Sequence, residues 1–536
     1  MNLHEKINIR LLQLTKRAEV SDPKILLETF VNVGMLEPML STVDHQVIYG
    51  RRGTGKTHAL QYLSEIKKSE GDITIYIDMR KIGSSVGIYS DTSIEITERA
   101  TRLLRDTLTT IHEGVHVAYF SDQNKFRNDI SNELDDFISA SIKTIVTGVV
   151  SNESSSSGMM KDISSKSIGI NTSLVDFKLS LNANAANENS TTDNSKLHSS
   201  GVLRHHVSFG AIANLFEKIN LASYGKKTWI LLDEWSSVPL ELQPFLADLI
   251  RRCILPVKKN VIKIAAIEQR SRFKINGENI GEYTGLEIGC DISADLNLDD
   301  FMVFEHDAKR ATTFFSKLLF NQITSEGKGN LKLDLETDSS FVSNAFTQIT
   351  AFEEMVRAAE GVPRDAINIA SLCAQKANNS AIGIHHVRSA AKTWYLRDKE
   401  SSVSTNKSAL DLLHWIVNQV IAHRRARAFL VLSGERDLLI DTLFDARVIH
   451  LLKRNISSHD NPGTRYDAFK IDYGCYVDLL TTASAPQGLL PLDDDNEQFI
   501  DVPPDDYRAI RRAILDLNDF YKEQSKKSLT NLELTS

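Results

Sequence analysis

The fold of this chain is decided by the stretch Val47-Ile48-Tyr49-Gly50-Arg51-Arg52-Gly53-Thr54-Gly55-Lys56-Thr57-His58-Ala59-Leu60. Apolar residues come before a glycine-rich segment and an amphipathic pattern comes after it, which predicts a strand, a loop and a helix. The loop, from Gly50 to Thr57, fits the pattern G-x-x-x-x-G-K-[ST]. Glycine allows positive φ and leaves space beside the backbone for an anion. The alternative interpretation is a glycine turn followed by an incidental lysine.

The loop and the start of the helix form the predicted phosphate-binding site. Successive N–H groups and a helix N-terminus attract phosphate oxygens. Lys56 is expected to reach the β- and γ-phosphates of ATP, and the Thr57 hydroxyl to ligate Mg²⁺. The full set of predicted nucleotide contacts is Gly50, Arg51, Arg52, Gly53, Thr54, Gly55, Lys56, Thr57 and His58.

A second chemical element is the apolar strand Trp229-Ile230-Leu231-Leu232, which ends in Asp233 and Glu234. Downstream of a phosphate-binding loop, such a pair suits ATP hydrolysis. Asp233 is expected to hold Mg²⁺ through water, and Glu234 to polarise the attacking water as general base. The alternative is an acidic pair that only caps the next helix.

The composition is that of a globular protein with several domains. The chain has 536 residues, of which 42% are hydrophobic and 25% charged. Its formal net charge of -8 gives no global sign of a nucleic-acid coat or a polybasic membrane binder. No apolar run approaches the ~20 residues that span a bilayer. The N-terminus lacks the apolar core of a signal peptide. We therefore expect no membrane association.

The cysteines point to a reducing compartment. They are far apart and form no C-x-x-C pair, at Cys253, Cys290, Cys373 and Cys475. Neither a disulfide framework nor a zinc site is expected, and a cytoplasmic location fits.

The first part of the chain alternates strands and helices, which predicts a parallel α/β sheet. Residues 1–40 are expected to be helical before it. The expected strands lie at 47–49, 73–78, 228–232 and 261–267, with a further one at 286–292. The expected helices lie at 58–68, 95–113, 209–220 and 240–254.

The alternation is interrupted by a Ser/Asn-rich insertion at about 151–201. Its composition is typical of a flexible segment, with room for a short hairpin around Ile168 to Leu179. Two interpretations stay open, a solvated loop and an element that senses or binds a partner.

The second half is predicted to be helical at 307–323 and 340–400, with a polar linker at 401–406. A different pattern follows. It predicts a helix at 408–423, a strand at 428–432, a helix at 438–454, strands at 466–471 and 473–480 and a last helix near 505–523. Helix, strand, helix and hairpin together suggest a winged-helix domain. Its arginines, Arg424, Arg425 and Arg427, favour DNA contact, while its balanced charge favours protein docking.

These elements resemble one family. The phosphate loop, the strand ending in Asp233-Glu234, the segment Gly361-Val362-Pro363-Arg364 and the winged-helix pattern are similar to those of AAA+ ATPases related to the origin-recognition complex. Bacterial relatives of that group, including signal-transducing STAND ATPases, share this layout. The resemblance covers roughly residues 20 to 480.

The resemblance implies roles for further residues. In AAA+ ATPases the strand after the Asp-Glu strand ends in a polar residue that senses the γ-phosphate, which points to Gln269, with Glu268 as the second candidate. Arg270 and Arg272 are candidates for arginines that act on a neighbouring subunit in a homo-oligomer, or else are solvated loop residues. Arg364 is expected to open a lid helix and face the γ-phosphate; the alternative is an ordinary helix start with proline in its first turn.

The fold prediction is an α/β protein with a P-loop AAA+ core on a parallel sheet, a helical lid and a C-terminal winged-helix-like domain. The predicted boundaries are 1–40 for an N-terminal helical segment, 41–310 for the core with its insertion, 311–400 for the lid, 401–490 for the winged-helix-like domain and 491–536 for an acidic segment and a helix.

The predicted activity is Mg²⁺-dependent ATP hydrolysis that drives a molecular switch or oligomer. Two hypotheses for its purpose stay open. One is a bacterial antiviral defence sensor that meets a protein partner through the insertion or the C-terminal region. The other is a DNA-binding initiator- or transposition-type ATPase. A third hypothesis, a scaffold that binds nucleotide without hydrolysis, conflicts with the Asp233-Glu234 pair.

Overall fold

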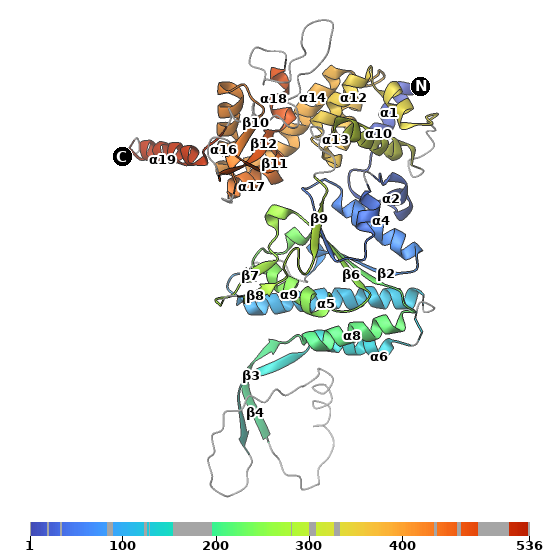
Figure 1. Cartoon of the computed structure of the whole chain (residues 1–536), viewed down its shortest axis with the longest axis vertical. Helices are drawn as coiled ribbons and strands as arrows, with labels where there is room; N and C mark the ends of the chain where they lie inside the picture. The colour runs from blue at the N-terminus through green and yellow to red at the C-terminus, as the bar shows by residue number, and fades with distance from the viewer. Residues whose placement is uncertain are drawn as a thin grey trace, which may run out of the picture. The chain divides into compact units, whose positions relative to one another are not determined.

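The computed structural model describes residues 2–18, 21–32, 35–82, 89, 91–122, 126–127, 129–153, 196–279, 281–299, 307–325, 333–433, 437–457, 463–480 and 514–533. The chain forms two compact units (Figure 1). The helical unit comprises Met1–Leu40, Gly50–Tyr62 and Asn297–Ser536. The sheet unit comprises Ser41–Tyr49 and Leu63–Leu296. The phosphate loop thus belongs to the helical unit, and the strand before it to the sheet unit.

The sheet unit is built on five strands in the order β2-β5-β6-β1-β9. Strands β2, β5, β6 and β1 run parallel. Every residue of β5 and β6 is buried, as expected of parallel strands covered on both faces. The bounds are Gln46–Tyr49 for β1, Ile73–Asp78 for β2, Thr228–Asp233 for β5, Asn260–Ala266 for β6 and Ser293–Asn297 for β9. The predicted parallel sheet is confirmed.

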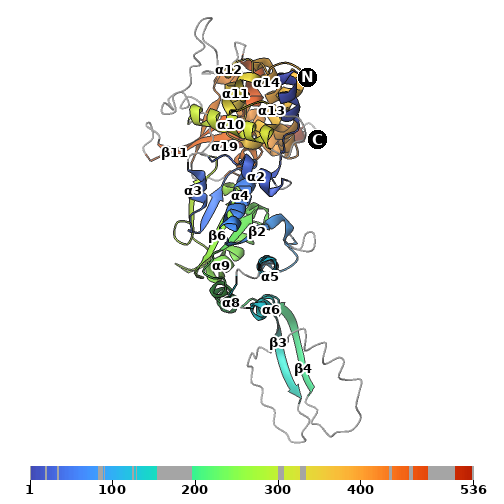
Figure 2. The same cartoon turned by 90° about the vertical axis from the view of Figure 1, so that its right-hand side faces the viewer.

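Helices pack on this sheet through apolar stripes. Helix α5 buries Leu104, Leu108, Ile111 and Val115 at helical spacing. It packs against β2, and α6 lies beside α8 (Figure 2). The helices after the loop are α4 (Lys56–Ser69), α5 (Ile96–Ser121), α6 (Ser131–Ser141), α8 (Phe209–Ala222) and α9 (Gln243–Cys253). The sequence predicted all of these except α6.

The strand expected at 286–292 is wrong. Two of its apolar residues, Ile288 and Ile292, form only an isolated bridge around a turn. Gly289 has φ +89°, and the Asp291 carboxylate accepts a hydrogen bond from the Glu287 N–H at 2.7 Å. The turn separates the two apolar positions, so the strand begins later, at Ser293. A small antiparallel pair, β7 (Lys274–Asn276) and β8 (Tyr283–Gly285), lies before it.

The predicted insertion is bounded by a hairpin that the sequence did not predict. Strands β3 (Thr144–Glu153) and β4 (Lys196–His205) are antiparallel and pair over their whole length. The hairpin expected around 168–179 lies outside the described residues.

The helical unit combines the N-terminal helices with those of the second half. These are α1 (Leu3–Leu12), α2 (Pro23–Thr29), α3 (Leu36–Leu40), α10 (Ala308–Thr324), α11 (Asp338–Ala345), α12 (Ile349–Ala358), α13 (Pro363–Ala377) and α14 (Ile384–Trp394). A π-helical turn, Tyr395–Glu400, leads from α14 into α15 (Ser401–Ser404). The polar linker expected at 401–406 is therefore wrong, because Val403 is fully buried and anchors a helix there.

The C-terminal region, residues 407–480, keeps the predicted order with two corrections. It contains α16 (Lys407–Val417), a π-helical turn (Asn418–His423), β10 (Ala428–Leu432), α17 (Leu438–Asp445), β11 (Ile449–Ser457), β12 (Arg465–Ile471) and α18 (Tyr473–Tyr476). The helix expected at 438–454 ends at Asp445, and β11 follows. The strand expected at 473–480 is instead α18 and a 3₁₀ turn, because the Asp472 side chain caps the Gly474 N–H.

The hairpin of this region is thus formed by β11 and β12, in a sheet of order β10-β12-β11. The last helix, α19 (Leu517–Glu533), begins later than the expected residue 505. Among the described residues, no helix is long and apolar enough to cross a membrane.

The contact between α5 and β2 generates a stability prediction. A Cβ added at Gly114 of α5 would lie 2.5 Å from Ile75 Cγ2. Gly114→Ala should therefore destabilise the protein by about 1–3 kcal/mol through overpacking, which outweighs the gain of up to ~1 kcal/mol in helix propensity. In an Ile75→Ala background the same substitution should become neutral or stabilising. Urea unfolding of the wild type, the two single variants and the double variant measures the coupling. If the two changes in the free energy of unfolding simply add, the contact is contradicted.

Candidate functional site

The predicted phosphate-binding loop starts directly after β1 and ends where α4 begins at Lys56. Gly53 and Gly55 have φ angles of +90° and +96°, which residues with a side chain rarely adopt. The Lys56 ammonium is buried and donates hydrogen bonds to the carbonyl oxygens of Gly50 and Arg51, at 2.8 and 2.9 Å. Its positive charge is therefore held within the loop, next to the N-terminus of α4, where an anion is favoured.

Other loop side chains hold the loop in shape. The Thr54 hydroxyl donates to the Arg51 carbonyl oxygen at 2.9 Å. Arg51 itself is buried, and both its backbone N–H and its Nε donate to the Asp299 carboxylate, at 2.9 and 2.7 Å. Arg52, in contrast, is exposed. Nucleotide contacts by Arg51 and Arg52 stay predictions.

His58 connects the start of α4 to the N-terminal helices. Its Nε2 lies 2.9 Å from the Leu26 carbonyl oxygen of α2. Its ring meets Phe30 edge-on, with centroids 5.7 Å apart. Burial lowers the pKa of His58. These contacts give the residue a packing role beside its predicted place at the nucleotide.

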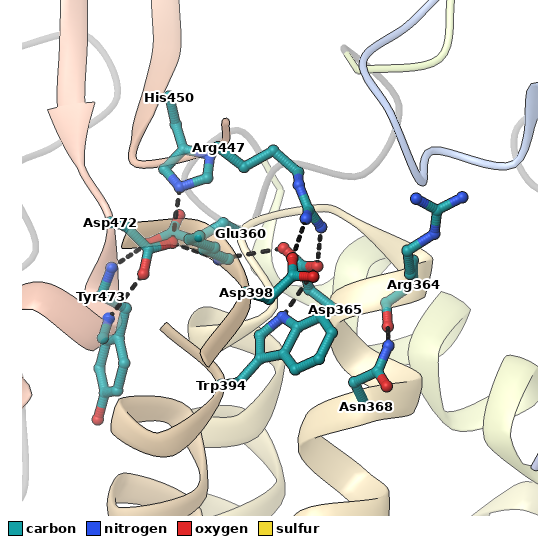
Figure 3. Close-up of polar contacts among 12 residues, drawn as sticks. Glu360, Arg364, Asp365, Asn368, Trp394, Asp398, Arg447, His450, Asp472 and Tyr473 are labelled. Atoms are coloured by element: carbon teal, nitrogen blue, oxygen red, sulfur yellow. Dashed lines mark hydrogen bonds and ion pairs between the residues drawn. The ribbon is translucent and has the colours of Figure 1, made fainter. Parts of the chain in front are cut away.

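Arg364, the residue predicted to open the lid helix, lies against the loop. It follows Pro363, the first residue of α13, and its N–H donates to the Gly53 carbonyl oxygen at 3.2 Å. A Cβ at Gly53 would lie 2.9 Å from Arg364 Cβ, so only glycine lets α13 approach this closely. Asn368 Nδ2 donates to the Arg364 carbonyl oxygen, while the guanidinium points away from it (Figure 3).

Asp233 and Glu234 end β5 in the sheet unit. Asp233 is fully buried, and its carboxylate accepts hydrogen bonds from the Tyr76 hydroxyl at 2.6 Å and from the Glu234 N–H at 2.8 Å. Glu234 has φ +56°, a left-handed conformation that costs a glutamate about 1–3 kcal/mol. The Glu234 side chain is 30% exposed.

The end of β2 supplies partners that the sequence did not single out. Asp78 lies in register with Asp233, and Arg80 binds it through Nε and Nη2, both at 2.9 Å. Burial alone would raise the pKa of Asp78, but the hydrogen bonds and charge of Arg80 outweigh it and hold that pKa below its usual value. The same guanidinium lies 3.9 Å from Glu234. The only sequence signal for this set is an Asp at a strand end.

Gln269, Arg270 and Arg272 lie just after β6. The 3₁₀ turn Glu268–Arg270 follows the strand, and the Ile267 N–H donates to the Ser236 hydroxyl at 2.8 Å. Gln269 is half-buried, while Arg270 and Arg272 are exposed. Their sensor and finger roles stay predictions.

The structure thus brings the predicted residues together in two groups. The loop and Arg364 meet within the helical unit. Asp233, Glu234 and the Gln269 segment meet within the sheet unit, at the carboxyl ends of β5 and β6. The predicted magnesium ligands, Thr57 and Asp233, are divided between the two groups.

A buried cluster in the helical unit has the donor types of a metal site. Ligand atoms of Glu360, His450 and Asp472 lie within 4.8 Å of one another. Figure 3 shows Glu360, His450 and Asp472 close together. However, Lys470 pairs with Glu360 at 2.6 Å and Lys399 with Asp472 at 2.5 Å. Ammonium groups already occupy the carboxylates, so the cluster is a charge-balanced network and no metal is assigned to it.

Comparisons with known proteins give one family match, and its range includes both the loop and the Asp-Glu strand. Residues 14–273 match the family described as ORC-CDC6-like. Cdc6p from Pyrobaculum aerophilum is 10% identical, with 84% of this chain and 94% of that chain covered and a TM-score of 0.29. The ORC1 protein of Aeropyrum pernix, solved in complex with DNA, is 12% identical, with 84% and 93% covered and a TM-score of 0.28. No curated protein matches the chain.

The buried network predicts a pH effect on stability. Burial, opposed by Asp472 and assisted by the charge of Arg51, lowers the pKa of His450 from 6.5 to about 3. Below pH 6.5 the unfolded chain therefore binds a proton that the folded chain does not, and stability falls as the pH is lowered toward 3. Between about pH 7 and about pH 5 this histidine should remove about 2 kcal/mol of stability.

The check is urea unfolding at both pH values for the wild type and His450→Gln. The glutamine has no proton to gain, so the stability of the variant should fall by about 2 kcal/mol less than that of the wild type. Equal losses in the two proteins would show that His450 is protonated in the folded state.

Proposed function

This chain is ORC-CDC6-like over residues 14–273, and on that premise we propose that it is a Mg²⁺-dependent AAA+ ATPase whose nucleotide drives a switch or an assembly. The observation that carries the proposal is the loop from Gly50 to Thr57. Its glycines adopt positive φ, and its lysine is held inside it. The Arg364 N–H donates a hydrogen bond to the Gly53 carbonyl oxygen of the loop. This combination of a positive charge and a helix N-terminus suits the phosphates of ATP.

The proposed division of labour follows from the strand ends. Strands β1, β6 and β5 are parallel, so their carboxyl ends share one edge of the sheet. The loop continues from β1, and Asp233 is the last residue of β5. We assign phosphate binding to Lys56 and Mg²⁺ binding to Thr57 and Asp233. The ion would neutralise the charge that develops on the phosphates during transfer.

Glu234 is the proposed general base. Its left-handed backbone and partial exposure leave the carboxylate able to accept a proton from water. Gln269 is the proposed sensor of the γ-phosphate. Arg270 and Arg272 are exposed and are proposed to act on a neighbouring copy in a homo-oligomer.

Two substitutions test the activity. Lys56→Ala should weaken binding of a fluorescent ATP analogue by at least about tenfold, because a charge-assisted contact to phosphate is lost. Glu234→Gln should keep that affinity and slow phosphate release by about 10²–10⁴-fold, since only proton transfer is removed. Lys68→Ala, an exposed lysine at the other end of α4, is the matched control and should change neither. Unchanged hydrolysis in Lys56→Ala would refute the proposal.

DNA binding is the second candidate function, and two surface arginines of the C-terminal region favour it. Arg424 and Arg425 are exposed between α16 and β10, whereas Arg427 is buried. The initiator-type hypothesis therefore rests on the first two. The defence-sensor hypothesis relied partly on residues 154–195, which lie outside the described residues, and no described residue adds to it.

The DNA hypothesis predicts a salt-dependent affinity. If each arginine contacts one phosphate, replacing Arg424 and Arg425 by alanine should reduce the slope of log affinity against log salt by about 0.9 per arginine. Lys407→Ala, an exposed basic residue at the start of α16, is the control. Fluorescence anisotropy with duplex DNA at several salt concentrations measures the slope; equal slopes in all proteins would rule out these arginines as the DNA contact.

A further inference from the structure

Arg51 of the phosphate loop is held by residues far away in the sequence. Its side chain is only 3% exposed. Besides Asp299, the guanidinium meets His450 Nδ1 at 2.5 Å and lies 4.9 Å above the Phe444 ring. Phe444 belongs to α17 and His450 to β11, so both partners come from the C-terminal region. The loop that is proposed to bind nucleotide is therefore fixed directly by that region.

The contact between Arg51 and His450 sets the state of the imidazole. A guanidinium has only donors, so His450 Nδ1 must be the acceptor and carries no proton. The other nitrogen, Nε2, then carries the hydrogen and donates it to Asp472 at 2.9 Å. His450 is thus a neutral bridge between the loop arginine and a buried aspartate. Figure 3 shows the side of this bridge that faces Asp472.

The chain of contacts continues to the lid helix and returns to the loop. Lys399 pairs with Asp472 at 2.5 Å and with Asp365 at 3.0 Å. Asp365 is the neighbour of Arg364, whose N–H donates to the Gly53 carbonyl oxygen. The same connected set of residues therefore contacts the loop twice, at its second residue through His450 and at its fourth through α13.

Stability alone is a weak reason for such a network. The free energy needed to remove charged groups from water is about as large as the free energy gained from their mutual attraction. A protein with a buried ion pair is therefore often no more stable than one with apolar residues in its place. They do select one geometry, because a displaced partner leaves an unpaired charge. A network that selects one geometry can therefore couple the position of the loop to the position of the C-terminal region.

We propose that the C-terminal region regulates nucleotide binding by holding the phosphate loop through Arg51 and His450. The proposal rests on the ATPase function proposed above and names its regulator. While His450 accepts from Arg51, the loop keeps the conformation that receives phosphate. Movement of β11 removes that acceptor and lowers nucleotide affinity. Because coupling between two sites is reciprocal, bound nucleotide also favours the docked position of the C-terminal region.

The test uses two conservative substitutions of His450 in the full chain. In His450→Asn the amide oxygen takes the place of Nδ1 and still accepts from Arg51. In His450→Gln the amide reaches the place of Nε2, so the contact with Asp472 is kept and that with Arg51 is lost. The dissociation constant of a fluorescent ATP analogue with Mg²⁺ should rise about 5- to 150-fold in the glutamine variant and much less in the asparagine variant.

A double mutant and a control separate coupling from general damage. Arg51→Met with His450→Gln should bind no more weakly than Arg51→Met alone, since both remove the same contact. The control is Arg388→Gln, which breaks a partly buried ion pair with Glu354 in the same unit but does not touch the loop. Its affinity for the analogue should equal that of the wild type.

A second measurement needs no variant. Hydrogen exchange of the wild-type chain with and without the ATP analogue should show slower exchange of amides in β11 and at residues 472–476 when nucleotide is bound. Amides of α11, in the same unit but outside the network, should not change. No change at β11 would overturn the proposal even if every variant failed to fold.

The outcomes distinguish the two proposals. Normal affinity of the wild type together with equal affinity of His450→Gln overturns the regulation and leaves the ATPase assignment intact. A wild-type chain that does not bind the analogue overturns both. A weaker affinity in Arg388→Gln equal to that in His450→Gln would assign the effect to lost stability and overturn the coupling.

Discussion

The helical unit depends on a lysine that water does not reach. The Lys399 side chain is 1% exposed and pairs with two carboxylates that are as buried as it is, those of Asp365 and Asp472. Burial would lower the pKa of this lysine, but the two aspartates outweigh burial and raise it, so the ammonium stays charged. Removing Lys399 takes away a positive charge that both buried carboxylates share, and breaking a buried ion pair in this way costs about 3–5 kcal/mol.

The three members of this pairing come from different parts of the chain. Asp365 lies at the start of α13, Lys399 in the π-helical turn after α14, and Asp472 between β12 and α18. The lid helices and the C-terminal region are consequently one folded body and not two domains on a flexible connection. The serines after residue 400 have the composition of a linker, yet the chain there is helical and Val403 is fully buried.

The sequence predicted those parts of the site that are written in consecutive residues. The loop with Lys56, the strand ending in Asp233 and the helix opening at Arg364 each have a local pattern, and the structure has each element where the pattern predicts it. The partners of these residues have no such pattern. Tyr76 reaches Asp233 across 157 positions, and Arg51 reaches His450 across 399. Hydrogen bonds of this kind are decided by tertiary packing, so periodicity and spacing do not reveal them.

The same limit explains the wrong element boundaries. Apolar residues at 286–292 and 473–480 suggested strands. In each stretch an aspartate side chain instead accepts a hydrogen bond from a backbone N–H, which stabilises a turn at Glu287 and a helix after Asp472. Short aspartate side chains compete with strand pairing for backbone N–H groups. At 401–404 the serine-rich composition suggested a linker, but the chain is helical there, because burial of Val403 stabilises the helix.

The hairpin of β3 and β4 has a consequence for how this protein can vary. Glu153 and Lys196 are directly paired, so the segment between them enters and leaves the sheet unit through adjacent strands. A chain inserted between paired strand ends need not stretch or rearrange its host. Doubling the length of such a segment adds only about 0.6 kcal/mol of closure entropy if it behaves as a flexible loop. The segment between β3 and β4 can therefore be exchanged for another, in evolution or by protein engineering, while the sheet unit keeps its fold.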